Sequence, residues 1–300
     1  MKAIIDCPHL RGPIGRSHCS SCQGNVSLKV QSCRMFGKCT LVKELDGVSC
    51  CRTCPLNPSM DNPTMRLKWM YGVTTCPSRR ESLLPKTLVS LRDAGFSAPH
   101  LFVDGASTGF ASVGPALQLS GITYRDPSVG VYGNWVLSIA ELYIRDPLAD
   151  RYAVFQDDLV AVGNLRRYLD ASPYPNKGYL NLYSATPQNE VLFTKGEGWY
   201  ESNQMGRGAL ALVFSREILV ALLSSTSSIK HLVEKPMDNV RGKRNVDGAI
   251  LTAMQSIGVK EYIHNPSLTQ HCGDLSTIGN HCMKAKTWRA DFDPMVLISH

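Results

Sequence analysis

The segment Arg151-Tyr-Ala-Val-Phe-Gln-Asp157-Asp158 determines the fold that the sequence predicts. Its middle residues are apolar and favour β-structure, and a short run of this kind is typical of a strand buried on both faces of a sheet. Two adjacent acids follow directly. In open α/β sheets, ligands bind beyond the carboxyl ends of the strands. The segment therefore predicts a core strand with functional carboxylates at its end.

The flanking sequence alternates strand-like and helix-like segments. We expect further strands over residues 68–75, 100–104 and 121–124, and helices over residues 79–95 and 132–145. The strands are rich in β-branched and aromatic residues, and the helices have apolar residues three or four positions apart. This alternation predicts a parallel α/β sheet buried on both faces. The dinucleotide-binding GxGxxG and the phosphate-binding GxxxxGK[ST] motifs are absent from the sequence.

The first 54 residues differ from the rest because they hold eight of the eleven cysteines. Two Cys-x2-Cys pairs, each with two more distant partners, are typical of tetrahedral zinc sites. The predicted ligand sets are Cys7, His9, Cys19 and Cys22, and Cys33, Cys39, Cys51 and Cys54. We therefore expect a small zinc-ribbon-like module over residues 1–60, with about two structural zinc ions, that folds only on binding metal.

Other arrangements of these cysteines stay open. Cys50 lies beside Cys51 and can replace it as a ligand. Four cysteines can also hold an iron–sulfur cluster, which is an alternative for the second set. Disulfides need an oxidising compartment, and the sequence from Met1 to Cys7 does not resemble an export signal. A cytoplasmic location is therefore expected.

The composition limits the class of protein. With 43% hydrophobic and 19% charged residues, the chain is predicted to fold rather than to be disordered. Apolar runs stay well short of the roughly 20 residues of a membrane helix, so no membrane partner is expected. The net charge is +7, and residues 1–65 hold eight Lys and Arg against four Asp and Glu. This balance permits a polyanionic partner without requiring one.

Several motifs resemble those of GT-A glycosyltransferases, in the same order along the chain. They are found in residues 72–79, 103–105, 133–135, 155–158 and 206–216. Residues 266–273, Pro-Ser-Leu-Thr-Gln-His-Cys-Gly, are similar to the closing motif of the N-acetylglucosaminyltransferase IV group. The Cys-rich segment resembles leaders placed before bacterial sugar transferases, except that Phe36 stands where those leaders often have a histidine.

The resemblance implies a GT-A domain, a Rossmann-like α/β fold that binds a nucleotide-sugar, over residues 66–300. It also implies a catalytic Mn²⁺ or Mg²⁺ with Asp158 and His271 as protein ligands, because oxygen ligands and a neutral imidazole suit these ions. Gln156 departs from the acid usual at the first position of the family's metal-binding triplet. The donor-binding residues implied are Thr74, Thr75, Arg79, Asp104, Asn134, Gln156, Asp157 and Arg207.

Asp247 is the candidate catalytic base. Apolar residues follow it in the pattern of a helix start, and an acid at this position in inverting members removes the acceptor's proton. Asp in the first turn of a helix is also a common cap, so both roles stay open for Asp247.

We thus expect metal-dependent transfer of a sugar, from a UDP-sugar donor, to an acceptor hydroxyl. A uridine donor is favoured because a strand-end acid such as Asp104 can accept the imide N–H of uracil. The basic leader and the basic segment 230–244 suggest a hydroxymethylated base in DNA as acceptor; a glycan or small molecule is the alternative. Two other classes remain: a zinc-ribbon nucleic-acid-binding protein with an idle α/β domain, and a nucleotidyltransferase.

The cysteine spacing generates a first prediction. The purified chain is expected to contain about two zinc ions, because each ligand set closes one tetrahedral site. Elemental analysis measures this ratio, and replacing Cys22 and Cys54 by serine, one at a time, is expected to remove one ion each. A ratio below one, or a brown protein that contains iron, contradicts the prediction.

Overall fold

The computed structural model describes part of the chain, namely residues 5–6, 13–14, 67–105, 110, 118–171, 178–184, 196–206, 208–226, 246–273 and 283–298. The chain divides into two compact units, Met1–Leu67 with Arg167–Tyr174, and Lys68–Arg166 with Pro175–His300. In the first unit, β1 (Ile5–Asp6) pairs antiparallel with β2 (Pro13–Ile14). The predicted zinc ligands lie outside the described residues, so the zinc-ribbon-like module stays a prediction.

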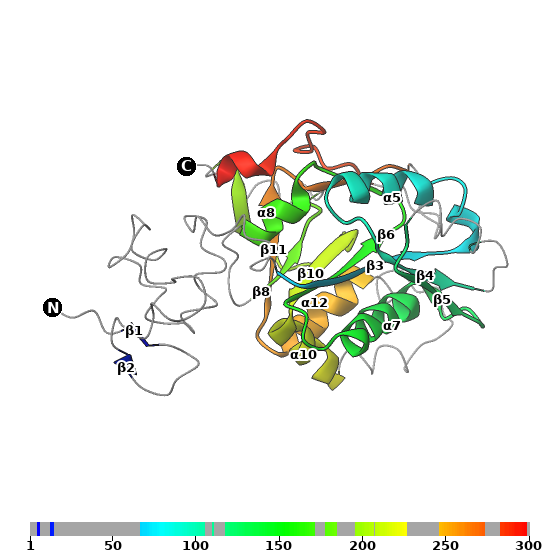
Figure 1. Ribbon diagram of the computed structural model, residues 1–300, viewed down its shortest axis with the longest axis horizontal. Helices are drawn as coiled ribbons and strands as arrows, with labels where there is room; N and C mark the ends of the chain where they lie inside the picture. Colours follow the sequence, from blue (N-terminus) through cyan, green and yellow to red (C-terminus); the bar gives the residue numbers. More distant parts are fainter. Residues whose placement is uncertain are drawn as a thin grey trace. The chain divides into compact units, whose positions relative to one another are not determined.

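The second unit is a mixed α/β domain built on an eight-stranded sheet (Figure 1). The strand order is β5-β4-β3-β6-β10-β8-β11-β9. The strands are β3 (Trp69–Thr75), β4 (His100–Asp104), β5 (Gly121–Arg125), β6 (Arg151–Gln156), β8 (Gly178–Asn181), β9 (Gly198–Glu201), β10 (Ala211–Ser215) and β11 (Lys260–Asn265). The segment that determined the predicted fold is β6, at the centre of this sheet.

The predicted parallel sheet is confirmed for six of the eight strands and wrong for β9 and β10, since β8 and β11 also pair in parallel. Strands β3, β4, β5 and β6 are mutually parallel. Strand β10 runs antiparallel to both β6 and β8, and β9 runs antiparallel to β11. The physical reason is that β10 is as apolar as β6, and a buried apolar run has the same composition whichever way it runs.

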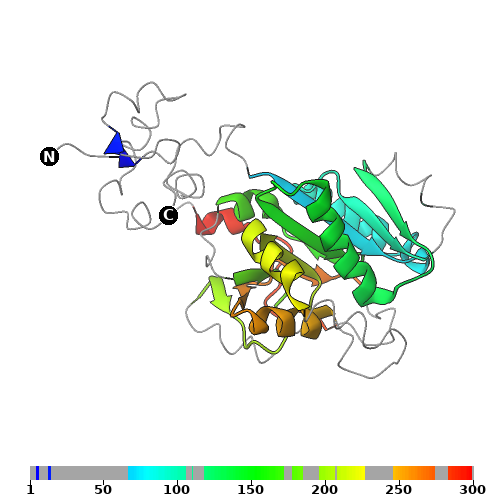
Figure 2. The ribbon, with the colours of Figure 1, turned by 90° about the horizontal axis from the view of Figure 1, so that it is seen from below.

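Helices cover both faces of the sheet, as predicted. Figures 1 and 2 show α7 (Gly130–Arg145), α10 (Arg216–Ser224) and α12 (Val246–Ser256) on one side and α5 (Leu84–Asp93) on the other. A 3₁₀ turn, Pro77–Arg79, precedes α5, and another, Pro294–Leu297, lies near the end of the chain. Strands β7 (Leu159–Ala161) and β12 (Thr269–His271) form a second, two-stranded sheet. Helix α8 (Leu165–Ala171) comes directly after β7 in the chain.

Aromatic residues fill the core on each face of the sheet. On the α5 side, Phe96 contacts Trp69, Tyr71 and Phe155 edge-on, with ring centroids 5.6, 5.1 and 5.1 Å apart. On the α7 side, the Trp135 ring lies 6.0 Å from Phe214. Edge-on pairs of this kind stabilise beyond the area that they bury. The central strands are therefore held rigidly between two apolar layers.

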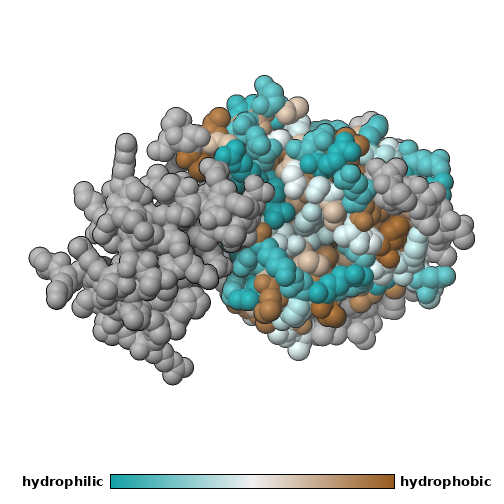
Figure 3. All heavy atoms as spheres, viewed as in Figure 1, coloured by the Kyte–Doolittle hydropathy of each residue, from teal (hydrophilic) through white to brown (hydrophobic). Residues whose placement is uncertain are grey.

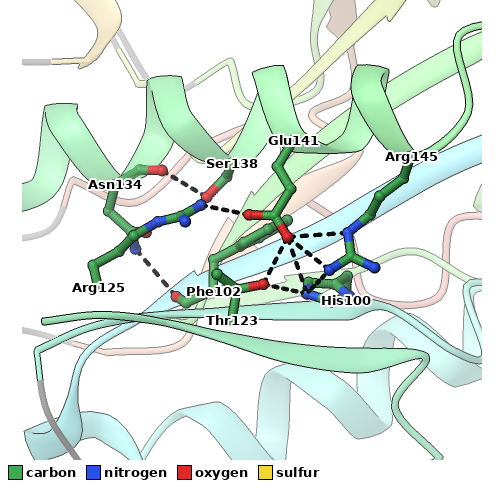
Figure 4. A network of polar contacts seen from close by, with 8 residues as sticks. All are labelled: His100, Phe102, Thr123, Arg125, Asn134, Ser138, Glu141 and Arg145. Atoms are coloured by element: carbon green, nitrogen blue, oxygen red, sulfur yellow. Dashed lines mark hydrogen bonds and ion pairs between the residues drawn. The ribbon is translucent and has the colours of Figure 1, made fainter.

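A polar network fastens α7 to the outer strands β4 and β5 (Figure 4). Glu141 accepts hydrogen bonds from the Thr123 hydroxyl at 2.7 Å, from Arg145 at 2.7 Å and from Arg125 at 2.9 Å. Burial acts to raise the pKa of Glu141, but these three hydrogen bonds outweigh it and lower the pKa. His100 lies in the same network, and burial together with the nearby Arg145 charge lowers its pKa to about 4. The network therefore holds a charged glutamate and a neutral histidine.

On the face seen in Figure 3, hydrophilic and hydrophobic residues are interspersed over the described part of the second unit. Among the helices that the structure describes, none combines the length and the apolar character needed to cross a membrane.

Glu261 on β11 is a buried acid with incomplete hydrogen bonding. Its side chain is 2% exposed, and one oxygen accepts hydrogen bonds from the Tyr179 hydroxyl at 3.1 Å and from Asn181 at 3.2 Å. The other oxygen, Oε2, is buried without a hydrogen-bond partner among the described residues. Burial raises the pKa of Glu261, and the charge of Asp247 adds to this shift.

This environment predicts how Glu261→Gln changes stability with pH. Because the folded pKa lies above the unfolded value of 4.5, the native protein binds more protons than the unfolded chain above that pH. The contribution of Glu261 to the free energy of unfolding therefore falls as the pH rises. Urea unfolding at pH 5 and pH 8 is expected to show that Glu261→Gln gains stability relative to wild type at the higher pH. The exposed Glu81→Gln is the control, and parallel pH profiles for Glu261→Gln and wild type contradict the prediction.

Candidate active site

The turn between β6 and β7 carries the two predicted acids, Asp157 and Asp158. Both are buried, with 8% and 5% of their surface exposed. The Thr75 hydroxyl, at the end of the neighbouring strand β3, donates a 2.6 Å hydrogen bond to Asp157 Oδ2. Burial raises the pKa of Asp157 to about 6; the Thr75 hydrogen bond opposes this shift and the Asp158 charge adds to it. Asp157 is thus held in place by the strand beside it.

Pairing of β7 with β12 brings the second predicted metal ligand to the first. His271 is the register partner of Leu159, the residue directly after Asp158. The backbone N–H of Cys272 donates a 2.8 Å hydrogen bond to the carbonyl of Asp158. As a result, His271 Nδ1 lies 3.5 Å from Asp158 Oδ2. The structure therefore brings together the two residues that the sequence predicted to share a metal ion.

Two polar atoms of the Asp158–His271 pair make no hydrogen bond with the described residues. Asp158 Oδ1 and His271 Nδ1 are both buried, and neither has a hydrogen-bond partner among the described residues. Buried polar atoms in native proteins almost always have partners, so such atoms often indicate an ion or a ligand. Within the described residues, His, Cys, Asp and Glu nowhere form a group of three suited to a metal. A divalent ion held by Asp158 and His271 thus needs further oxygen ligands, such as the phosphates of a bound nucleotide.

Arg79 places a cation beside this pair. It ends the 3₁₀ turn after β3, it is 7% exposed, and its Nη2 atom lies 3.9 Å from Asp158 Oδ2. Gly273 packs closely against Arg79 and the nearby Leu83. A Cβ at Gly273 would lie 2.8 Å from Leu83 Cδ1 and 3.6 Å from Arg79 Nη1. A guanidinium in this position can bind phosphate oxygens with two parallel hydrogen bonds. Donor contact by Arg79 stays a prediction.

Asp247 lies in the first turn of α12, as predicted. Its Oδ2 atom accepts a 2.6 Å hydrogen bond from the backbone N–H of Gly208. A Cβ on Gly208 would lie 2.5 Å from Tyr183 Cδ1, so the glycine packs directly against the Tyr183 ring. That ring lies edge-on to His271, with centroids 5.0 Å apart at 83°. A chain of contacts therefore joins the candidate base to the candidate metal ligand.

Two predicted donor-binding residues at the strand ends make hydrogen bonds within the protein. The Thr74 hydroxyl donates to the Phe155 carbonyl at 3.3 Å, and Gln156 Nε2 donates to the Ala209 carbonyl at 3.0 Å. Both side chains are only partly buried. These contacts join neighbouring strands, and donor binding by Thr74 and Gln156 stays a prediction.

Asp104 and Asn134 also bind other parts of the protein. The carboxylate of Asp104 accepts hydrogen bonds from the Ser128 hydroxyl at 2.9 Å and from the Val129 N–H at 2.8 Å. Asn134 is buried and donates to the Phe102 carbonyl at 3.1 Å. These bonds orient the start of α7 against β4. Contact of either residue with the donor stays a prediction, and Arg207 lies outside the described residues.

Thr87 on α5 is a residue that sequence analysis missed. Its hydroxyl accepts from the Leu159 N–H at 3.1 Å and donates to the Leu159 carbonyl at 2.9 Å. Ser90, one turn later, accepts from the Ala161 N–H at 2.8 Å. The two hydroxyls thus satisfy the edge of β7 that β12 leaves open. A small polar residue on the buried face of an amphipathic helix was the available signal, but its partner could not be identified from sequence.

Comparisons with known proteins find distant structural likeness only. Neither a family model nor a curated protein matches the chain. Among solved structures, GalNAc-T7 with UDP, GalNAc and Mn²⁺ is similar at 10% identity, covering 78% of this chain and 46% of the other, with a TM-score of 0.46. The chain therefore spans less than half the length of that protein.

Two further solved structures come from different enzyme classes. A mannosyltransferase from Pyrobaculum calidifontis, in complex with GDP-Man and Mn²⁺, is 14% identical, with 66% of this chain and 55% of the other covered and a TM-score of 0.43. A nucleotidyl transferase from Methanothermobacter is 15% identical, with 65% and 85% covered and a TM-score of 0.38. Because these similarities are too distant to assign a function, the assignment depends on the residues of the site.

The unpartnered atoms of Asp158 and His271 generate a prediction. Asp158→Ala and His271→Ala are each expected to weaken binding of Mn²⁺ by roughly tenfold or more in the presence of UDP, because each removes one candidate protein ligand. Electron paramagnetic resonance of free Mn²⁺ measures the affinity, and thermal unfolding checks the fold. Asp150→Asn, which alters an acid preceding the opposite end of β6, is the control. Wild-type affinity in Asp158→Ala contradicts the proposed ligand.

Proposed function

We propose that this protein is a metal-dependent glycosyltransferase that transfers a sugar from a UDP-sugar to an acceptor hydroxyl. The observation that carries the proposal is the pair of buried ligand atoms, Asp158 Oδ1 and His271 Nδ1, at the carboxyl end of a central strand. Ligands of open α/β sheets bind at this edge. The strand order, with β10 antiparallel to both of its neighbours, is compatible with the GT-A resemblance of the sequence.

Asp158 and His271 would hold Mn²⁺ or Mg²⁺. The bound ion supplies charge stabilisation to the diphosphate as it leaves the sugar. Arg79 lies 3.9 Å from Asp158 and is placed to add a second positive charge on the same phosphates. Asp157 accepts a hydrogen bond from Thr75, which would hold its carboxylate in place for contact with the donor.

Asp247 would act as the general base. One of its oxygens is fixed by the Gly208 N–H at 2.6 Å, which leaves the other able to accept a proton. In the proposed reaction this carboxylate takes the proton of the acceptor hydroxyl while the acceptor oxygen bonds to the anomeric carbon. The bond from that carbon to the diphosphate breaks, and its electron pair leaves with UDP. Attack opposite to the leaving group inverts the anomeric configuration.

The acceptor is proposed to be a hydroxymethylated base in DNA. The support is the excess of positive charge in residues 1–65, which hold eight Lys and Arg against four Asp and Glu. Contacts of basic side chains with phosphates supply most of the affinity of non-specific DNA binding.

A nucleotide-sugar hydrolysis screen tests the function. Mn²⁺-dependent release of UDP from a UDP-sugar, abolished by a chelator, is expected, with faster release when DNA containing 5-hydroxymethylcytosine is added. Unmodified DNA and free glycans are the parallel arms. Release of pyrophosphate from a nucleoside triphosphate and a sugar phosphate would instead identify a nucleotidyltransferase, and no release with any donor would overturn the proposal.

Replacement of the base gives the sharpest mutational prediction. Asp247→Asn is expected to lower turnover by roughly 10²–10⁴-fold, the effect of losing a general base. The amide oxygen can still accept the hydrogen bond from Gly208, so a cap role alone predicts little loss. Turnover is measured on the accepted substrate, with UDP affinity measured by calorimetry.

Glu217→Gln is the matched control, since Glu217 is the acid in the first turn of α10. It is expected to keep wild-type turnover. If Asp247→Asn does the same, Asp247 is a helix cap and another group must remove the proton.

A further inference from the structure

The residues after β12 fold back onto the strand that carries His271. Ala285 exchanges hydrogen bonds with the Gln270 side chain, its N–H donating at 3.0 Å and its carbonyl accepting at 3.1 Å. Lys284 Nζ donates to the His271 carbonyl at 2.9 Å and to the Gly273 carbonyl at 3.1 Å. Residues 283–285, which we call the strap, therefore fix the backbone on both sides of the candidate metal ligand.

Tyr183 connects the strap to the His271 ring. It lies just after β8, it is 3% exposed, and its hydroxyl donates a hydrogen bond to the Met283 carbonyl. The Tyr183 and His271 rings meet edge-on at 83°, with centroids 5.0 Å apart. The strap thus holds the tyrosine, and the tyrosine limits rotation of the imidazole.

The other side of Tyr183 supports the loop held by Asp247. Gly208 packs so closely on the ring that a Cβ would lie 2.5 Å from Cδ1. The N–H of the same glycine is bound to Asp247 Oδ2 at 2.6 Å. A single aromatic ring is therefore in contact with the candidate metal ligand and with the loop that fixes the candidate base.

Histidine ligands of metal ions usually depend on a neighbouring group that sets the orientation of the ring. His271 Nδ1 lies 3.5 Å from Asp158 Oδ2, so a group that orients the imidazole must contact the ring elsewhere. The Tyr183 ring makes such a contact, edge-on at 5.0 Å between centroids, and packing against it restricts rotation of the imidazole.

We propose that Tyr183 is a positioning residue for His271, which holds the imidazole toward Asp158 so that both can bind one divalent ion. This inference rests on the proposed function, since it concerns the same metal site. Tyr183 itself does not contact the ion in this proposal. Its loss is therefore expected to change metal affinity more than the rate at saturating metal.

The test uses the full chain and Mn²⁺ with UDP as probes. Tyr183→Met removes the aromatic ring and leaves a flexible apolar side chain, and Tyr183→Phe keeps the ring and loses only the bond to the strap. Tyr183→Met is expected to weaken Mn²⁺ binding by about 10–100-fold, the usual effect of losing a group that orients a ligand. Tyr183→Phe is expected to weaken it less. Once a sugar-transfer assay exists, the Mn²⁺ concentration for half-maximal rate should rise in Tyr183→Met while the maximal rate is largely kept.

Controls separate this inference from the proposed function. Tyr71→Phe removes a hydroxyl from a strand of the same unit and is expected to bind Mn²⁺ as wild type does. Tyr183→Leu replaces Tyr183→Met if that variant unfolds. Equal Mn²⁺ affinity in wild type and the folded variant, with loss in His271→Ala, overturns the positioning role alone. Wild-type protein that binds no Mn²⁺ with UDP overturns the metal site and the positioning role together.

Discussion

The pairing of β7 with β12 is the interaction on which the candidate site depends. Register alone sets His271 opposite Leu159, and the Cys272 N–H fixes the Asp158 carbonyl at 2.8 Å. A slip of one residue would turn the imidazole to the other face of the strand. The distance between the Asp158 and His271 side chains therefore depends on the hydrogen bonds of the backbone.

The rest of the domain keeps that small sheet in place. Thr87 and Ser90 satisfy the outer edge of β7 from helix α5, while Thr75 fixes Asp157 from strand β3. The contacts of Thr87 and Thr75 are buried, and a buried polar group left without its partner would cost about 1–3 kcal/mol. The site is thus attached to a helix, a central strand and the C-terminal strand, so a shift of any one element moves Asp158.

The strands, the helices and the candidate ligand pair could be predicted from the sequence, whereas the residues that hold this pair in place could not. The strands β3, β4 and β6 and the helix α7 are visible in the apolar pattern, and the family resemblance indicated Asp158 and His271. The direction of β10 was missed because an apolar run does not record it. Thr87 and Tyr183 were missed because their roles depend on partners distant in the chain. For the same reason, the hydrogen bonds of Asp104 and Asn134 with their own protein could not be foreseen.

The separation of Asp158 and His271 along the chain also bears on when the candidate site can form. Asp158 is synthesised together with β3 to β6, whereas His271 and the strap follow only after β8 to β11. Domains generally fold as units, so the early strands are not expected to reach their final arrangement one at a time. Strand β7 cannot pair with β12 before residue 271 has been made. The position of Asp158 beside His271 is therefore fixed only when the last strand that the structure describes has been synthesised.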